Sequence, residues 1–176
     1  DALVALQELY STSERWDDQV QVVERLLTIV TGVEQKKTYY RTLGVVYGEK
    51  LNDPAQAIDG WTHVLDLDPK NDDALSALRA LYLLAESWEE LVDILRRMIP
   101  LQSEQDDVLQ LYLQLASIYQ ERMERIDDAI AAWRRVLELD STHEQALHTL
   151  ETLLVGKEDG RGVIEVLAMQ EAVVEE

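Results

Sequence analysis

The sequence contains no cysteine, which excludes a disulfide framework and any metal site built from thiolates. It also has only 7 Gly and 3 Pro among its 176 residues, so it is poor in the residues that interrupt helices. Leu, Ala, Glu, Gln and Arg are abundant instead, and we find no convincing strand pattern. The composition therefore favours an all-α chain.

Basic residues are scarce relative to acidic ones. The chain has 16 Lys and Arg against 35 Asp and Glu, which gives a formal net charge of −19 at pH 7. A surface of this charge repels nucleic acid and anionic membranes, so we expect neither as a partner. No apolar run approaches the roughly 20 residues needed to span a bilayer, so we also expect no direct membrane insertion.

The motifs of catalysis and phosphate binding are absent as well. There is no Gly-rich phosphate loop, no nucleophile elbow and no His-Glu-x-x-His motif. Two helix faces combine carboxylates with a histidine, but neither has a second cluster to complete a metal shell: Glu144, His148 and Glu151, and Asp59, His63 and Asp66. We therefore expect no enzyme activity, no metal and no cofactor.

Much of the acidity falls where helices are expected to begin. Acidic pairs start the periodic apolar stretches at Asp17-Asp18, Asp72-Asp73, Glu89-Glu90, Asp106-Asp107 and Asp127-Asp128. Carboxylates at a helix N-terminus complement the helix dipole and contribute about 0.3–1 kcal/mol each when exposed. We interpret these pairs as helix starts rather than as a binding surface.

An internal repeat with an offset of 72 residues is the strongest indication of the fold. The stretch from Tyr40 to Pro69 predicts a helix hairpin, because both halves have apolar residues at helical spacing and Asp68-Pro69 ends the second. Its pattern Tyr40, Leu43, Tyr47, Ala57, Ile58, Trp61, Val64, Leu65, Asp68 returns as Tyr112, Leu115, Tyr119, Ala129, Ile130, Trp133, Val136, Leu137, Asp140. A second pattern, Ala2, Leu3, Leu6, Leu9, Tyr10, Glu14, Trp16, returns as Ala74, Leu75, Leu78, Leu81, Tyr82, Glu86, Trp88.

Each period therefore holds two hairpins, and the chain about five, at 1–35, 36–71, 72–107, 108–143 and 144–176. The links between helices are short, so neighbouring helices run antiparallel. A single hairpin of this size cannot bury its own apolar face and must stack on its neighbours. The fold predicted is an all-α solenoid of about five antiparallel helix hairpins.

This pattern resembles the tetratricopeptide repeat (TPR) along essentially the whole chain. A TPR unit of 34 residues has an aromatic, Leu-Gly and Tyr on its first helix, and Ala, an aromatic, a small residue and Pro on its second. The matching residues are Tyr40, Leu43, Gly44, Tyr47, Ala57, Trp61, Val64 and Pro69. The resemblance implies a right-handed superhelix and a single TPR-like domain over residues 1–176, which we expect to be a fragment of a longer repeat protein.

The chain departs from the TPR pattern in two ways. Ten residues separate Tyr47 from Ala57, and also Tyr119 from Ala129, one more than in the family. In the other hairpins, larger side chains replace the small residues at which the two helices meet, namely Gln7, Arg79 and Glu151 on the first helix and Gln19, Leu91 and Val163 on the second. We expect those hairpins to be splayed or shifted.

In TPR proteins the ligand usually lies in a concave groove lined by the first helix of each hairpin. Carried over by position, this face predicts a partner-binding groove made of Thr38, Arg41, Val45, Ser76, Ala80, Leu83, Leu113, Ser117, Gln120, His148 and Thr152, with Val4, Glu8, Ser11 and Gly48 on the same face. This lining is mostly small and neutral, which suits an amphipathic helix or an extended peptide, neutral to basic, from a partner protein. The Lys and Asn residues with which some family members clamp a C-terminal carboxylate are not matched, since only Arg41 has a suitable charge. The predicted function is a protein-protein interaction scaffold.

Two alternatives stay open. In the first, the groove residues bind nothing and are merely solvated or covered by the superhelical curvature of the array itself. In the second, the chain is a structural or self-associating segment of a larger multidomain protein. The C-terminal helix favours self-association, because it has more apolar residues than one interface requires: Val163, Ile164, Val166, Leu167, Met169, Val173 and Val174. Four tryptophans lie on the apolar stripes of their helices and are interpreted as core rather than as an aromatic binding set: Trp16, Trp61, Trp88 and Trp133.

Overall fold

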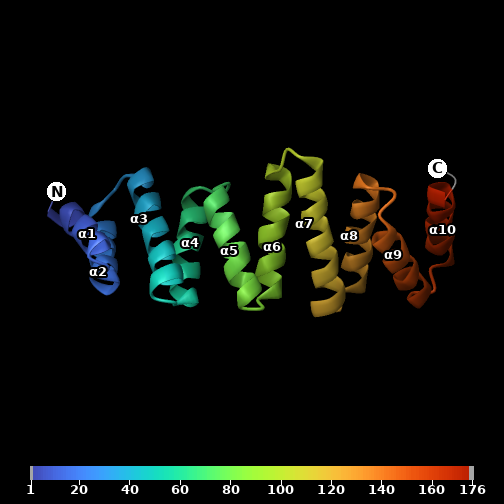
Figure 1. Ribbon diagram of the computed structural model, residues 1–176, viewed down its shortest axis with the longest axis horizontal. Helices are drawn as coiled ribbons and strands as arrows, with labels where there is room; N and C mark the ends of the chain where they lie inside the picture. Colours follow the sequence, from blue (N-terminus) through green and yellow to red (C-terminus); the bar gives the residue numbers. More distant parts are fainter. Residues whose placement is uncertain (1, 175–176) are drawn as a thin grey trace. The chain divides into compact units, whose positions relative to one another are not determined.

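The computed structural model describes residues 2–174, and these form ten α-helices and no strand (Figure 1). The helices in chain order are α1 (Ala2–Thr12), α2 (Trp16–Ile29), α3 (Val33–Val45), α4 (Pro54–Leu67), α5 (Asp72–Leu84), α6 (Trp88–Met98), α7 (Gln105–Ser117), α8 (Ile126–Leu139), α9 (Glu144–Gly156) and α10 (Gly160–Val174). Short helices of other types extend three of them: η1 (Val46–Lys50) and η3 (Ile118–Arg122) are π-helices, and η2 (Ile99–Leu101) is a 3₁₀-helix. The predicted all-α fold of successive helix pairs is confirmed, although α3 and α7 begin slightly before the expected starts at 36 and 108.

The helices form two compact units, of which the first ends at Ser87 and the second begins at Trp88. In the first unit, α2 to α5 each pack against the helix before them, and in the second unit α7 to α10 do the same. Each unit is therefore a stretch of solenoid in which a helix mainly contacts its neighbours in sequence. None of the helices between residues 2 and 174 is long and apolar enough to cross a membrane.

The two π-helices accommodate the extra residue that the second and fourth hairpins contain. A π-helical turn closes its hydrogen bonds over five residues instead of four, so it holds one residue more than an α-helical turn. The Leu51 N–H donates to the Val46 carbonyl at 3.0 Å, and the Met123 N–H donates to the Ile118 carbonyl at 3.1 Å, each with this wider span. The insertion is absorbed at the end of the first helix, which leaves the second helix in the register of the repeat.

Helix starts follow the sequence signals. The five acidic pairs lie in the first turns of α2, α5, α6, α7 and α8, as predicted. The side chains of Asp53, Asn71 and His143 each accept a backbone N–H of the helix that follows, at 3.1 to 3.2 Å. These bonds satisfy N–H groups that a helix start otherwise leaves without a partner.

Each hairpin turn contains one residue in the left-handed conformation, with φ between 52° and 59°: Glu14, Asn52, Glu86, Glu124 and Glu158. A left-handed residue after a helix ends it and reverses the chain within a few residues. The turns achieve this without glycine, at some steric cost to the four glutamates.

Small residues let α3 and α4 approach closely, as the repeat pattern predicts. A Cβ atom on Gly44 would lie 2.7 Å from the Trp61 ring, and a Cβ atom on Gly60 would lie 2.7 Å from the Gly44 backbone nitrogen. Trp61 and Trp133 are only 6% and 3% exposed, so their interpretation as core residues is confirmed.

Trp16 and Trp88 are only half-buried, although Trp16 packs against the buried cluster of Val20, Val23, Leu43 and Val46. They are the first residues of α2 and α6, and helix ends lie nearer to solvent than helix middles. A cation covers each ring instead: Lys50 Nζ lies 5.6 Å from the Trp16 ring centroid, and Arg122 Cζ lies 5.2 Å from that of Trp88. Because the two pairs are one period apart, this cation–π contact is part of the repeat.

Candidate functional site

A pocket opens beside the first helices of the first unit, and four residues of the predicted groove face line it. Thr38, Arg41 and Val45 of α3 and Ser11 of α1 border a cavity of about 380 Å³. The other lining residues come from α1, α2, α3 and η1, and the whole set, which we call the Gln19 pocket, is Gln7, Ser11, Trp16, Gln19, Thr38, Arg41, Thr42, Val45, Val46 and Lys50. The pocket therefore joins the first hairpin to the second.

Gln19 is buried in the wall of this pocket, and its amide oxygen has no partner. The residue is 3% exposed, and no group within residues 2–174 donates a hydrogen bond to Gln19 Oε1. A buried polar group without a hydrogen bond costs about 1–3 kcal/mol in proteins. Since Gln19 lines the cavity, a hydrogen bond from a ligand to its amide would recover that cost.

The sequence contained a signal for this pocket that the groove prediction did not use. Gln7 and Gln19 stand where the TPR pattern has small residues, at the contact between the two helices of a hairpin. One period later, Leu91 takes the place of Gln19 and is 0% exposed. The first hairpin thus has an amide where the third has apolar core.

Two cations border the pocket, and both have partners. Arg41 Nη2 lies 2.8 Å from Asp73 Oδ2 on α5, with both side chains more than half exposed. Lys50 lies over the Trp16 ring and 4.0 Å from the Glu49 carboxylate. Exposed ion pairs of this kind contribute only about 0–1 kcal/mol, so a ligand acceptor can compete for these cations.

The hydroxyl groups of α3 donate along their own helix. Thr38 Oγ1 donates to the Glu34 carbonyl at 2.9 Å, and Thr42 Oγ1 donates to the Thr38 carbonyl at 3.0 Å. Their oxygens remain available as acceptors. The pocket therefore presents hydroxyl and amide acceptors beside cationic donors, a mixture that matches the alternating N–H and C=O groups of a peptide backbone.

Five other predicted groove residues lie on first helices outside this pocket. On α5, Ser76, Ala80 and Leu83 are exposed, Leu83 to 47%. On α9, His148 and Thr152 are exposed, and Thr152 Oγ1 donates to the His148 carbonyl at 3.0 Å. These residues offer accessible surface but no enclosed site.

The last three predicted residues belong to α7 and η3. Leu113 and Ser117 are half-buried. Gln120 Oε1 accepts a hydrogen bond from the Trp133 indole Nε1 at 3.0 Å, so this amide orients a core tryptophan. A ligand can reach the Leu113 side chain only in part.

The histidine of one cluster considered for metal binding takes part in packing. His63 stacks on Tyr40 with ring centroids 4.5 Å apart and planes 15° from parallel. Its Nδ1 lies 2.9 Å from the Asp59 carbonyl oxygen. Across the described part of the chain, no three His, Asp or Glu side chains are placed to hold a metal ion.

Comparison with solved structures identifies the fold. A crystal structure of MamA aligns with a TM-score of 0.53 at 18% identity, over 99% of this chain and 89% of that chain. A structure of MamA AMB-1 gives a TM-score of 0.55 at 13% identity, over 99% and 92%. YrrB, described as a TPR protein with an unusual peptide-binding site, gives 0.50 at 20% identity, over 97% and 84%. No protein-family model and no curated protein sequence matches the chain. At these identities the likeness establishes the fold, and the TPR fold expected from the repeat pattern is confirmed.

Proposed function

We propose that this chain, whose helices have the TPR fold, is a protein-interaction scaffold that binds an extended segment of a partner protein at the Gln19 pocket. The observation that carries the proposal is the buried, unpaired amide oxygen of Gln19 in a cavity that also gathers Thr38, Arg41 and Val45. If the pocket bound no ligand, the unpaired amide oxygen would only destabilise the fold, whereas a ligand N–H group would donate the missing hydrogen bond.

The chemistry of the pocket favours a peptide backbone over a small charged ligand. Acceptors on Gln19 and Thr42 suit peptide N–H groups, and Arg41 suits a peptide carbonyl or a polar side chain. The net charge of −19 favours neutral to basic partner segments over acidic ones, because it raises the encounter rate of basic segments and lowers that of acidic ones. YrrB shows that this fold is compatible with peptide binding.

Peptides selected from a random display library against the wild-type chain test this proposal. Gln19→Leu should lower the affinity of the selected peptides about tenfold, which corresponds to the loss of a buried hydrogen bond. Gln21→Leu is the matched control, because Gln21 is an exposed residue of the same helix. If the selected peptides bind Gln19→Leu as tightly as wild type, they bind elsewhere and the proposed site is wrong.

The wider groove is tested with the same peptides. Leu83→Glu and Leu113→Glu place a charge on α5 and α7, where the groove prediction expects apolar contact. If either variant binds the selected peptides more weakly with unchanged helicity, the binding surface extends beyond the Gln19 pocket. If both variants bind the peptides as tightly as wild type, the binding surface is confined to the Gln19 pocket.

Self-association through α10 is a second candidate, favoured by the apolar face of that helix. Ile164, Leu167 and Met169 are 70%, 42% and 38% exposed, whereas Val166 is 2% exposed and faces the core. Val173 and Val174, which the prediction also included, lie outside the residues whose side chains are described. Light scattering should detect dimers that Ile164→Glu abolishes, and a monomer over a wide concentration range would remove this candidate.

A further inference from the structure

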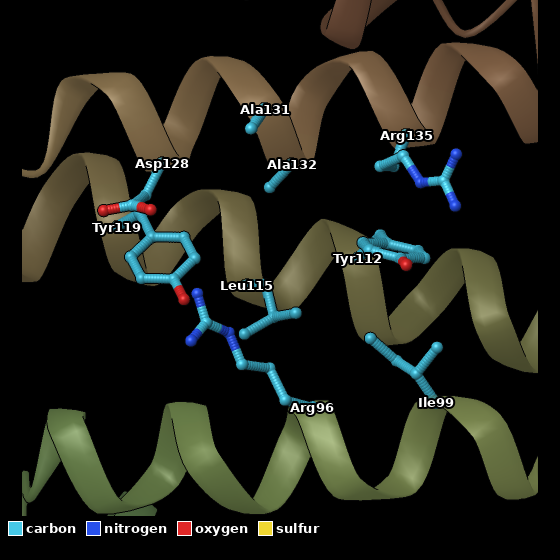
Figure 2. Close-up of a pocket in the computed structure, with 9 residues that line it drawn as sticks. All are labelled: Arg96, Ile99, Tyr112, Leu115, Tyr119, Asp128, Ala131, Ala132 and Arg135. Carbon is cyan, nitrogen blue, oxygen red and sulfur yellow. The ribbon is translucent and has the colours of Figure 1, made fainter.

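A second pocket lies within the second unit, between α6, α7 and α8 (Figure 2). Its volume is about 250 Å³, and we call it the Tyr119 pocket after its main lining residues, Arg96, Tyr112, Leu115, Tyr119, Asp128 and Arg135. Tyr112, Leu115 and Tyr119 share one face of the helix formed by α7 and η3, and the predicted groove residues of that helix lie on another face. The pocket is therefore separate from the predicted groove on α7, and it shares no lining residue with the Gln19 pocket.

The hydroxyl group of Tyr119 is buried in this pocket without a hydrogen-bond partner. Tyr119 is 2% exposed, and its Oη finds no partner within residues 2–174. Burial raises the pKa of Tyr119, so the phenol keeps its proton at neutral pH and needs an acceptor. Figure 2 shows the hydroxyl pointing toward the Arg96 guanidinium, which has only donors and cannot accept that proton.

The corresponding tyrosine of the first unit has a hydrogen-bond acceptor, which indicates the kind of group that the Tyr119 hydroxyl lacks. Tyr47 holds the equivalent position there, and its hydroxyl donates to the carboxylate of Glu24, with Oη 3.4 Å from Oε1. Glu24 and Arg96 are one 72-residue period apart, so a cation has replaced the carboxylate that accepts from the phenol. The second unit thus has the same tyrosine without its acceptor.

A second position on the pocket wall has also become cationic. His63 of the first unit is one period before Arg135, whose guanidinium carbon lies 5.9 Å from the Tyr112 ring centroid. Arg135 also pairs with Glu138 on its own helix. The Tyr119 pocket is therefore more positive than its counterpart in the first unit.

The carboxylate that lines the pocket already has a partner. Asp128 Oδ2 lies 2.7 Å from Arg125 Nε. Arg96, by contrast, forms no ion pair with any carboxylate of residues 2–174, and its guanidinium carbon lies 5.7 Å from the Tyr119 ring centroid. Within residues 2–174, a guanidinium without a carboxylate partner and a phenol without an acceptor therefore face the same space.

We propose that the Tyr119 pocket binds a carboxylate group, held by the Tyr119 hydroxyl and the Arg96 guanidinium, in the place that Glu24 occupies in the first unit. Both contacts are charge-assisted hydrogen bonds, which are stronger than bonds between neutral groups. Leu115 and Ile99 supply an apolar wall for an aliphatic stem. The ligand class is an aliphatic carboxylic acid, either free or as the Glu side chain of a partner protein.

NMR titrations with two probes test the proposal and distinguish these sources. The probes are butyrate and a capped alanine peptide with a central Glu, and a peptide with Gln in its place is the control. Both acids should shift the ring resonances of Tyr119 to saturation, and the Gln peptide should not. Tighter binding of the Glu peptide than of butyrate assigns the site to a protein partner, and equal or weaker binding assigns it to a free acid.

Three variants test the geometry. Tyr119→Phe removes only the hydroxyl and should lower the affinity for both acids about tenfold or more. Arg96→Glu restores the arrangement of the first unit, so it should abolish binding and shift the Tyr119 resonances without ligand. Tyr47→Phe makes the same change in the first unit and should leave binding unchanged.

The proposal is overturned by any of three results. These are the absence of a Tyr119 shift with both acids, an unchanged affinity in Tyr119→Phe, or an unchanged affinity in Arg96→Glu. Because Tyr119 and Arg96 belong to the second unit and neither lines the Gln19 pocket, the outcome does not depend on whether the Gln19 pocket binds peptides.

Discussion

Replacing Gln19 with Leu is the sharpest test of the idea that the Gln19 pocket retains an unsatisfied polar group for a ligand. Gln19 is 3% exposed and its Oε1 receives no hydrogen bond within the described part of the chain. Leu91 stands at the same position of the repeat and is 0% exposed, so the repeat accommodates Leu at this position. The substitution therefore exchanges an unpaired amide for an apolar group of similar length.

Two contributions set the expected size of the effect. Removing a buried group without a hydrogen bond recovers about 1–3 kcal/mol. Burying Leu contributes about 1.5–3 kcal/mol relative to leaving it exposed, but the methylene groups of Gln19 are already buried, so only about 0.5–1 kcal/mol of this is new. We expect Gln19→Leu to raise the free energy of unfolding by about 2 kcal/mol in the absence of ligand.

Urea unfolding followed by far-UV circular dichroism measures this change, and hydrogen exchange of the α2 amides locates it. The control Gln21→Leu should change the free energy of unfolding by no more than about 0.5 kcal/mol, because Gln21 is exposed. The converse variant Leu91→Gln should lower it by about 1–3 kcal/mol. A loss of stability in Gln19→Leu would refute the reasoning, since it would mean that the amide is hydrogen-bonded in the free protein.

Three further predictions concern the core, the π-helices and acid stability. Trp133→Ala should lower the free energy of unfolding by about 3–5 kcal/mol in calorimetry, because Trp133 is 3% exposed; a much smaller loss would contradict its burial. Deleting Glu121 from η3 should preserve helicity, because it turns a π-helical turn into an α-helical one. Deleting Ala131 from α8 should instead unfold the second unit, because it rotates the apolar stripe of α8 out of register. Equal losses of circular dichroism signal for the two deletions would contradict this explanation of the extra residue. Hydrogen bonds from Asn71 and Lys37 hold the pKa of the Asp68 carboxyl below its ordinary value, so the ionised carboxyl stabilises the fold above that ordinary value and loses this effect as the pH falls through the folded-state pKa. The variant Asp68→Asn should therefore lose less stability than wild type on acidification. Parallel profiles of melting temperature against pH for the two proteins would argue against these contacts.

Local signals accounted for most of the secondary structure. Acidic pairs such as Asp72-Asp73 and Asp127-Asp128 marked helix starts because they act on the helix dipole within one turn, whatever surrounds them. The extra residue before Ala57 was visible in the sequence, but its place was not, because one residue can lengthen either a turn or a helix. The bond between Leu51 and Val46 shows that it lengthened the helix.

The candidate site was predictable in part. Thr38, Arg41 and Val45 were assigned to one surface by helical spacing, and all three line one cavity. Gln120 was assigned to the same kind of surface, but its amide bonds Trp133, a contact between two helices that spacing along one helix does not reveal.

The sequence by itself determined the ten helices, their repeat and the small residues at which helices meet, because each follows from the spacing of residues along one chain segment. Only the tertiary structure decided which polar atoms lack partners. Within residues 2–174, Gln19 Oε1 and Tyr119 Oη have no hydrogen-bond partner because of what neighbouring helices place beside them, and the repeat shows this most clearly. Tyr47 and Tyr119 match in sequence, yet one phenol meets the carboxylate of Glu24 and the other meets the guanidinium of Arg96.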